Sequence, residues 1–156
     1  MTHFGVICPP LSGHIHPHAA LGRELQLRGH QVTMLQIPDL EFKVRSEGLQ
    51  FAAIGQSRYQ PGTLAKTMQH LATLDGIPAL QASVDFCADI AEMLCEDAPA
   101  AIAAAGIEFL IVDQLEIVDE TIAEALGLPF VCVSCGQSPP SFPEIRSSLN
   151  MCPSLR

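Results

Sequence analysis

The chain has 156 residues, 48% of them hydrophobic, and a mean hydropathy of +0.28, which favours one folded domain and excludes disorder over most of its length. Its 17 Asp and Glu against 8 Lys and Arg give a net charge of −9, so we expect no nucleic-acid partner. No apolar run reaches the roughly 18 residues that a membrane span needs, although an apolar patch leaves peripheral membrane contact open.

Compartment and redox state follow from the N-terminus and the cysteines. No basic region followed by an apolar one begins the chain, so we expect no signal peptide. The six cysteines form no dense framework, and Cys8, Cys132 and Cys135 lie in apolar runs where they act as small hydrophobic side chains. We therefore expect a reducing, cytoplasmic setting.

Short apolar runs alternate with helical patterns along the chain. The first run leads into a short loop that carries His14, and Pro17 then favours the first position of a helix that Gly29 ends. The strands predicted in chain order are His3–Cys8, Gln31–Ile37, Leu49–Ile54, Phe109–Asp113 and Phe130–Cys135; the helices are Pro17–Arg28, Asp39–Glu47, Ala79–Ala104 and Thr121–Leu126.

Two segments depart from this alternation. The section from Gln56 to Ala105 is long for a crossover; we expect an irregular first part and then an Ala-rich helix interrupted near Pro99. It forms either a wall of a binding pocket or plain cover for the sheet. The Ser- and Pro-rich residues 136–156 predict a linker-like or disordered tail, which confines the folded domain to residues 1–135.

This order predicts an α/β fold: a doubly wound, Rossmann-like parallel sheet of at least five strands flanked by helices, in the order 3-2-1-4-5. Strands one and four are then neighbours at the topological switch. His14 follows the first strand and Asp113 ends the fourth, so both face one crevice.

His14 and Asp113 suit a general base and its orienting carboxylate. The positive end of a helix dipole disfavours a protonated histidine, and a carboxylate on one ring nitrogen fixes the tautomer of the other. The alternative is a half-buried loop histidine and an aspartate that caps the next helix. Geometry alone does not separate the two.

Three other motifs say less about function. His14, His16 and His18 suggest a metal, but Pro17 breaks their alternation and the sequence places no Cys or Asp beside them, so we assign no metal site. Cys132 and Cys135 spell C-x-x-C at the end of a strand, which indicates a structural pair. The loop before His14 lacks the glycines of a phosphate cradle.

Two stretches carry a family resemblance. They are PPLSGHIHP at residues 9–17 with Leu21, Leu25 and RGHQVT at residues 28–33, and LIVDQ at residues 110–114 with AEALGLPFV at residues 123–131. Together they resemble the N-terminal, acceptor-binding domain of UDP-glycosyltransferases with the two-domain GT-B fold, most of all the bacterial zeaxanthin glucosyltransferase type. The resemblance covers about residues 2–135.

The resemblance implies an inverting hexosyltransferase that moves a sugar from a UDP-sugar to a hydroxyl of an apolar, carotenoid- or terpenoid-like acceptor. In that family the Gly-His histidine, matching His14 and not His16, deprotonates the acceptor, and the paired aspartate matches Asp113. The resemblance implies no metal and no cofactor beyond the donor substrate. We also assign Ser12, Gly13, Met68, Leu71, Leu74 and Phe86 to acceptor binding, with ordinary core packing as the alternative for the last four.

The donor-binding signature of the family's C-terminal domain is absent from these 156 residues. We therefore expect negligible transfer by this chain alone, with a donor half supplied elsewhere. Two rival interpretations stay open. One is the lipid-linked N-acetylglucosaminyl transferase of peptidoglycan assembly, whose glycine-rich loop is here replaced by Pro9, Pro10 and Leu11; the other is a non-catalytic module that binds an apolar ligand.

Overall fold

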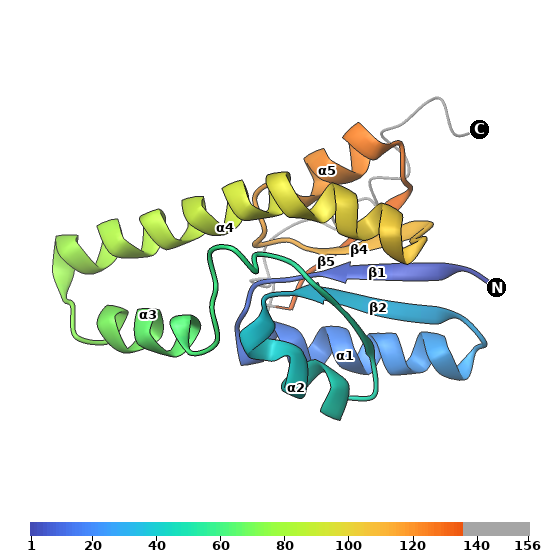
Figure 1. Ribbon diagram of the computed structural model, residues 1–156, viewed down its shortest axis with the longest axis horizontal. Helices are drawn as coiled ribbons and strands as arrows, with labels where there is room; N and C mark the ends of the chain where they lie inside the picture. The colour runs from blue at the N-terminus through green and yellow to red at the C-terminus, as the bar shows by residue number, and fades with distance from the viewer. Residues whose placement is uncertain (136–156) are drawn as a thin grey trace, which may run out of the picture.

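A computed structural model describes residues 1–135, which form a parallel sheet of five strands in the order β3-β2-β1-β4-β5 (Figure 1). The predicted tail at 136–156 lies outside the described residues. The strands are β1 (His3–Ile7), β2 (Gln31–Gln36), β3 (Gln50–Ala53), β4 (Phe109–Asp113) and β5 (Phe130–Val133); the helices are α1 (Ser12–Leu27), η1 (Pro38–Leu40, one 3-10 turn), α2 (Glu41–Ser46), α3 (Thr63–Leu71), α4 (Gly76–Ala105) and α5 (Asp119–Leu126). The predicted fold class and strand order are confirmed.

Helices cover both faces of the sheet, with α4 and α5 on one side and α1 and α2 on the other (Figure 1). Alternation along each strand divides its side chains between two cores. On β4, Leu110 and Val112 pack under α4 and α5, whereas Ile111 packs with α1 and α2. Asp113 is in phase with Ile111, so the strand itself directs the carboxylate toward α1.

The start of α1 differs from the prediction. The helix begins at Ser12 and contains Pro17, whereas we expected a loop through His14 and a helix opening at Pro17. A proline inside a helix removes one hydrogen bond, here to the carbonyl of Gly13, and tertiary packing of Ile15 and Ala19 offsets that loss. His14 therefore lies in the first turn of a helix, on a rigid element.

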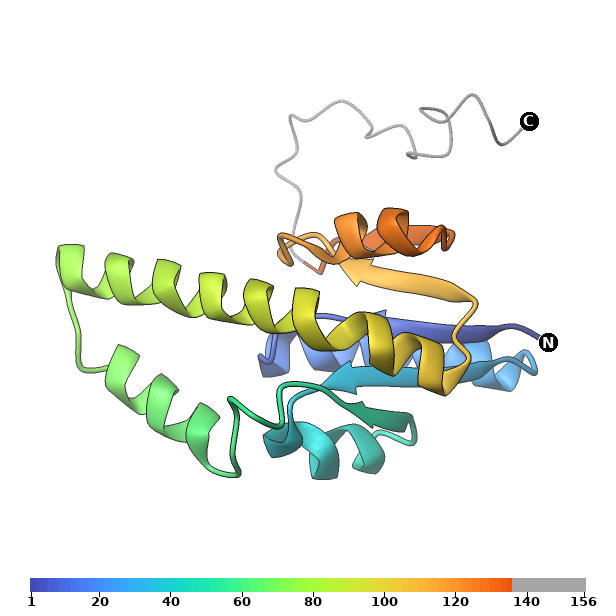
Figure 2. The same cartoon turned by 45° about the horizontal axis from the view of Figure 1, so that its top comes forward.

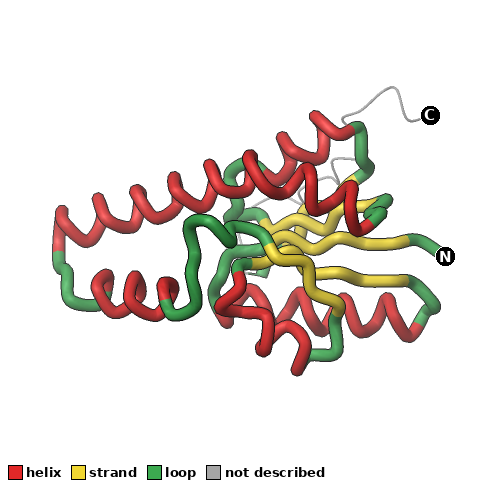
Figure 3. Tube along the Cα trace, viewed as in Figure 1, coloured by secondary structure: helices red, strands yellow, loops and turns green. Residues whose placement is uncertain are grey.

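The section between β3 and β4 also differs. We expected an irregular first part, but it contains α3, and we expected an interruption near Pro99, but α4 continues from Gly76 to Ala105. The carbonyl that Pro99 leaves without its helical donor belongs to Cys95, which is exposed, so water can satisfy it. Both helices extend past the edge of the sheet where the strands end (Figures 1 and 3). We call residues 63–88, which comprise α3, the turn after it and the first part of α4, the arm.

Polar contacts hold the arm and the rest of α4 against the segments that follow β2 and β3. The carboxylate of Asp39 accepts hydrogen bonds from the backbone N–H groups of Gly62 (2.5 Å) and Leu64 (2.8 Å), at the start of α3. The Arg58 guanidinium, in the loop after β3, donates to Asp89 at 2.9 Å and to Glu96 at 2.8 Å on α4. None of the described helices is long and apolar enough to cross a membrane.

Candidate active site

His14 and Asp113, 99 residues apart in sequence, meet at the switch point between β1 and β4. His14 Nδ1 lies 2.7 Å from Asp113 Oδ2. The carboxylate is fully buried, and the histidine side chain is 17% exposed. An ionised carboxylate only accepts, so Nδ1 carries the proton and the lone pair of the ring lies on Nε2. The predicted crevice thus brings the two side chains into direct contact.

Asp113 is held on its other side as well. Its Oδ1 accepts a hydrogen bond of 2.9 Å from the backbone N–H of Leu115, two residues on. The carboxylate therefore closes the turn after β4 while it contacts His14, and it does not cap the next helix, α5, which begins at Asp119 with Val118 at its N-cap. A buried carboxylate fixed at both oxygens is a rigid partner for an imidazole.

Two side chains that the sequence did not place here complete the cluster. His18 Nδ1 donates to the carbonyl of His14 (2.9 Å) and lies 3.6 Å from Asp113 Oδ2. Cys135 Sγ lies 3.3 Å from His18 Nδ1, and burial followed by the charge of Asp113 raises the pKa of its thiol to about 11. The spacing of four between His14 and His18 was the available signal, because such residues share one helix face.

His16 points away from this cluster. Its Nδ1 lies 2.8 Å from Glu47 Oε1 on the surface, and its side chain is 56% exposed. The Arg23 guanidinium hydrogen-bonds the same carboxylate and, with His16, lowers the pKa of Glu47. The phase of the helix therefore places His14 and His16 on different sides of α1. We assigned no metal site from the sequence because it placed no Cys or Asp beside the histidines, but in the structure Asp113 and Cys135 both lie beside His14.

Two acids after β4, Glu116 in the loop and Asp119 at the start of α5, have pKa values raised toward neutral pH. Burial, followed by the charge of Asp113, raises the pKa of Glu116 to about 7. Glu116 lines a water-sized hollow of about 10 Å³ together with Cys8, Pro10 and Gln36. Burial also raises the pKa of Asp119 to about 7, although its Oδ1 accepts a bond of 2.9 Å from the N–H of Glu120.

The residues assigned to acceptor binding lie around the same edge of the sheet. Ser12 and Gly13 are exposed in the first turn of α1; Ser12 Oγ accepts a bond from Lys43 Nζ at 2.5 Å, and a Cβ at Gly13 would meet no atom within 4 Å. Met68, Leu71 and Leu74 are half-buried on and after α3.

Phe86 differs from the other apolar residues of this set. It is half-buried on α4 and packs against the core cluster, as the core-packing alternative predicted. Nearer the start of α4, apolar side chains of the arm remain in solvent: Ile77 is 82% exposed and Leu80 is 66% exposed.

The doubly wound sheet of residues 1–135 has the architecture of one half of a GT-B glycosyltransferase, and the solved structures similar to this chain include glycosyltransferases. One is SsfS6 from Streptomyces sp. SF2575 in complex with thymidine diphosphate: TM-score 0.67, 18% identity, covering 86% of this chain and 38% of that one. The model of the glycosyltransferase family 28 N-terminal domain matches residues 12–137. The chain belongs to glycosyltransferase family 28.

Two curated relatives are similar in sequence. The zeaxanthin glucosyltransferase of Pantoea ananas is 36% identical over 135 residues, which cover 86% of this chain and 31% of the relative. A sterol 3-beta-glucosyltransferase of Eremothecium gossypii is 31% identical over 129 residues, which cover 81% of this chain and 10% of the relative. The chain thus spans about a third of the zeaxanthin enzyme's length.

Proposed function

We propose that this chain is the acceptor-binding half of an inverting glycosyltransferase that moves a sugar from a UDP-sugar to a hydroxyl of an apolar acceptor. The observation that carries the proposal is the 2.7 Å contact between His14 Nδ1 and the buried Asp113 carboxylate at the switch point of the sheet. Ligands of open α/β sheets bind at such points. The family supplies the class of reaction, and the pair supplies a base.

In the proposed reaction, His14 Nε2 removes the proton of the acceptor hydroxyl. The hydroxyl oxygen forms a bond to the anomeric carbon of the sugar on the face opposite the phosphate. The bond from that carbon to the phosphate oxygen breaks, and UDP leaves with the electron pair. Asp113 stabilises the imidazolium that forms on His14, because its carboxylate accepts the Nδ1–H in a water-poor setting.

The apolar acceptor is supported by two observations. The relatives with 31–36% identity are named for zeaxanthin and sterol, both apolar alcohols. Half-buried Met68 and Leu71 lie on α3, and half-buried Leu74 follows it; this part of the chain extends past the carboxyl edge of the sheet, where an acceptor bound at His14 would extend (Figure 3). Apolar side chains there would bury the body of the acceptor while its hydroxyl meets the base.

A hybrid enzyme tests the proposal. Residues 1–135 of this chain would replace the matching N-terminal region of the Pantoea ananas zeaxanthin glucosyltransferase, and transfer from UDP-glucose to zeaxanthin and a panel of aglycones would be measured by chromatography. We expect transfer by the hybrid and negligible transfer by the 156-residue chain alone, because the leaving group then lacks its stabilising contacts.

The control is the histidine on the opposite side of α1. His14→Ala should abolish transfer by the hybrid, and His16→Ala should retain it. An active His14→Ala hybrid would remove the base from the proposal. A folded hybrid that binds the acceptor but never transfers sugar, beside an active parent enzyme, would favour the non-catalytic binding module instead.

A further inference from the structure

The His14 cluster has the composition and spacing of a transition-metal site. Among the described residues, His14, Asp113 and Cys135 form one group whose ligand atoms all lie within 4.8 Å of one another. The group offers one nitrogen, one oxygen and one sulfur. Such mixed sets of N, O and S ligands suit Zn²⁺, whereas Mg²⁺ and Ca²⁺ prefer sets made of oxygen alone.

We propose that His14 Nδ1, an oxygen of Asp113 and Cys135 Sγ bind a thiophilic divalent cation, Zn²⁺ above all, and that this binding switches off the base. The cation replaces the hydrogen bond between His14 and Asp113. A water completes the tetrahedron, as in zinc sites with three protein ligands. The site is a regulatory one that shares side chains with the reaction.

The distances allow it with small movements. Zinc bonds of about 2.0–2.3 Å in a tetrahedron place ligand atoms about 3.3–3.6 Å apart. The His14–Asp113 contact of 2.7 Å must open by well under 1 Å, and the other two separations, each at most 4.8 Å, need to close by no more than about 1 Å. Asp113 stays fixed by Leu115. His14 is partly exposed and Cys135 follows the end of β5, so these two have room to adjust.

Charge and proton balance are also favourable. The thiol loses its proton to solvent when Sγ binds the cation. The imidazole stays neutral, but its proton moves from Nδ1 to Nε2. The charges of the cation, the thiolate and the carboxylate then sum to zero, which suits a buried site. Because Nε2 now carries a hydrogen, it has no lone pair for the acceptor proton.

The surroundings fit a site built to hold these groups in place. His18 Nδ1 donates to the carbonyl of His14, which fixes the turn that carries the ligand, and lies 3.3 Å from Cys135 Sγ. His18 Nε2 is buried without a hydrogen-bond partner among the described residues. The carboxylate, with its Leu115 bond, is the kind of oriented ligand that zinc sites use.

Cobalt spectroscopy on the purified 156-residue chain tests the site without any need for activity. CoCl₂ is added to the reduced, tag-free protein, and the thiolate-to-cobalt charge-transfer band and the visible bands of tetrahedral cobalt are recorded. We expect one cobalt per chain with both features, and their loss on addition of ZnCl₂. Cys135→Ser should lose the charge-transfer band, and His14→Ala should weaken binding.

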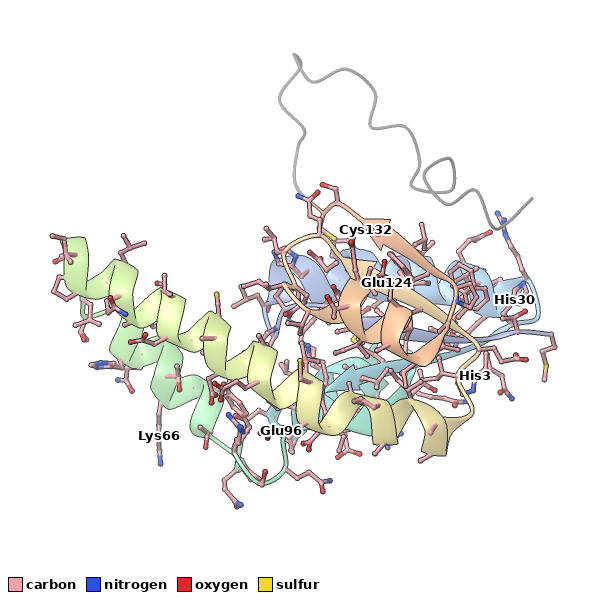
Figure 4. All side chains as sticks on the ribbon, turned by 90° about the horizontal axis from the view of Figure 1, so that it is seen from above. His3, His30, Lys66, Glu96, Glu124 and Cys132 are labelled. Carbon is pink, nitrogen blue, oxygen red and sulfur yellow. The ribbon has the colours of Figure 1, made fainter. Side chains whose placement is uncertain are left out.

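Matched controls lie close by. Cys132→Ser, in the edge strand β5 where Figure 4 labels Cys132, and His16→Ala should leave the spectrum unchanged. In the unmodified chain, cobalt should slow the alkylation of Cys135 by iodoacetamide more than that of Cys132, as mapped by peptide mass spectrometry. This second readout depends on no variant. A charge-transfer band that survives Cys135→Ser, or alkylation that cobalt slows equally at both cysteines, would overturn the proposal.

The inhibitory consequence rests on the proposed function, but the metal site does not. If the hybrid transfers glucose, ZnCl₂ should inhibit it, and Cys135→Ser should reduce that inhibition. Cobalt bound at Cys135 in a chain whose hybrid never transfers sugar would keep the site and refute the transferase. An active hybrid, together with a 156-residue chain that gives no thiolate–cobalt band, would keep the transferase and refute the metal site.

Discussion

The two ends of the proposed acceptor site are built in opposite ways. At the sheet, Asp113 is fully buried, bonded at both oxygens and in contact with a histidine on a helix whose Ile15 and Ala19 are also buried. On the arm, the apolar side chains are half-buried or exposed, and α3 and the start of α4 extend away from the sheet (Figure 2). A base needs fixed geometry, whereas an apolar acceptor needs a surface that can adapt to its shape. Substitutions can test this division from its rigid end to its adaptable end.

The largest effect should come from the buried carboxylate. Asp113→Asn in the hybrid keeps the size of the side chain but removes the charge that stabilises the His14 imidazolium. We expect kcat to fall by about 10²–10⁴-fold. Stopped assays of glucose transfer would measure it, with circular dichroism to confirm that the variant folds.

The matched variant is Glu47→Gln, because Glu47 accepts from His16 at 2.8 Å on the surface side of the same helix. This second histidine–carboxylate pair lies at the surface, so Glu47→Gln should leave kcat unchanged. Equal losses in the two variants would mean that burial of the Asp113 pair is irrelevant to the reaction.

The next largest effect should be a loss of stability from a substitution at the junction between the sheet and the arm. Gly55 has φ +69°, and a Cβ there would lie 2.2 Å from Met93 Sδ, in the core under α4. Gly55→Ala combines left-handed strain with overpacking, so we expect a loss of about 2–4 kcal/mol in unfolding free energy. Urea titration measures it.

Gly62 separates the two contributions. It has φ +89°, and a Cβ would meet nothing within 4 Å, so Gly62→Ala carries only the backbone strain of about 1–2 kcal/mol. If the two variants lose the same stability, contact with Met93 contributes nothing and the junction is looser than the structure indicates.

A smaller effect should appear in the pH dependence of stability. Burial raises the pKa of Asp119 to about 7, above its unfolded value near 4, so the folded state binds the proton more tightly. Stability from this group is full below about pH 4 and is lost as the pH rises to about 7. Asp119→Asn mimics the protonated acid and should remove this loss, so its advantage over the parent in unfolding free energy should grow across that range by about 1–3 kcal/mol in all, seen as a growing difference in Tm.

Glu124→Gln is the comparison, because Glu124 is an exposed carboxylate on the same helix. Its Tm difference from the parent should stay flat between pH 4 and 7. A flat difference for Asp119→Asn as well would show that its carboxyl titrates normally in the folded chain.

The sequence predicted the rigid end better than the arm, for physical reasons. Strand order follows from chain order and hydrophobic alternation, so the meeting of His14 and Asp113 could be inferred. The place of His18 one turn after His14 depends on α1 beginning at Ser12, and the residue pattern at Pro17 misplaced that start by five residues; Cys135 reaches the cluster from the chain after β5. The arm was harder still. Gly62 and Pro78 suggested irregular chain, yet contacts distant in sequence, such as Asp39 with the start of α3, stabilise helices there.

The smallest effect should come from the adaptable end. Met68→Gln and Leu71→Gln replace half-buried apolar surface on α3 with polar groups of similar size. Because a large acceptor can shift against such a surface, we expect KM for zeaxanthin in the hybrid to rise only about 3- to 10-fold, with kcat and Tm nearly unchanged. Leu64→Gln, on the same helix but packed against the core cluster, should instead lower Tm and spare KM. If Met68→Gln and Leu71→Gln lower Tm as much as Leu64→Gln and leave KM alone, these side chains are core residues and the acceptor lies elsewhere on the carboxyl edge of the sheet.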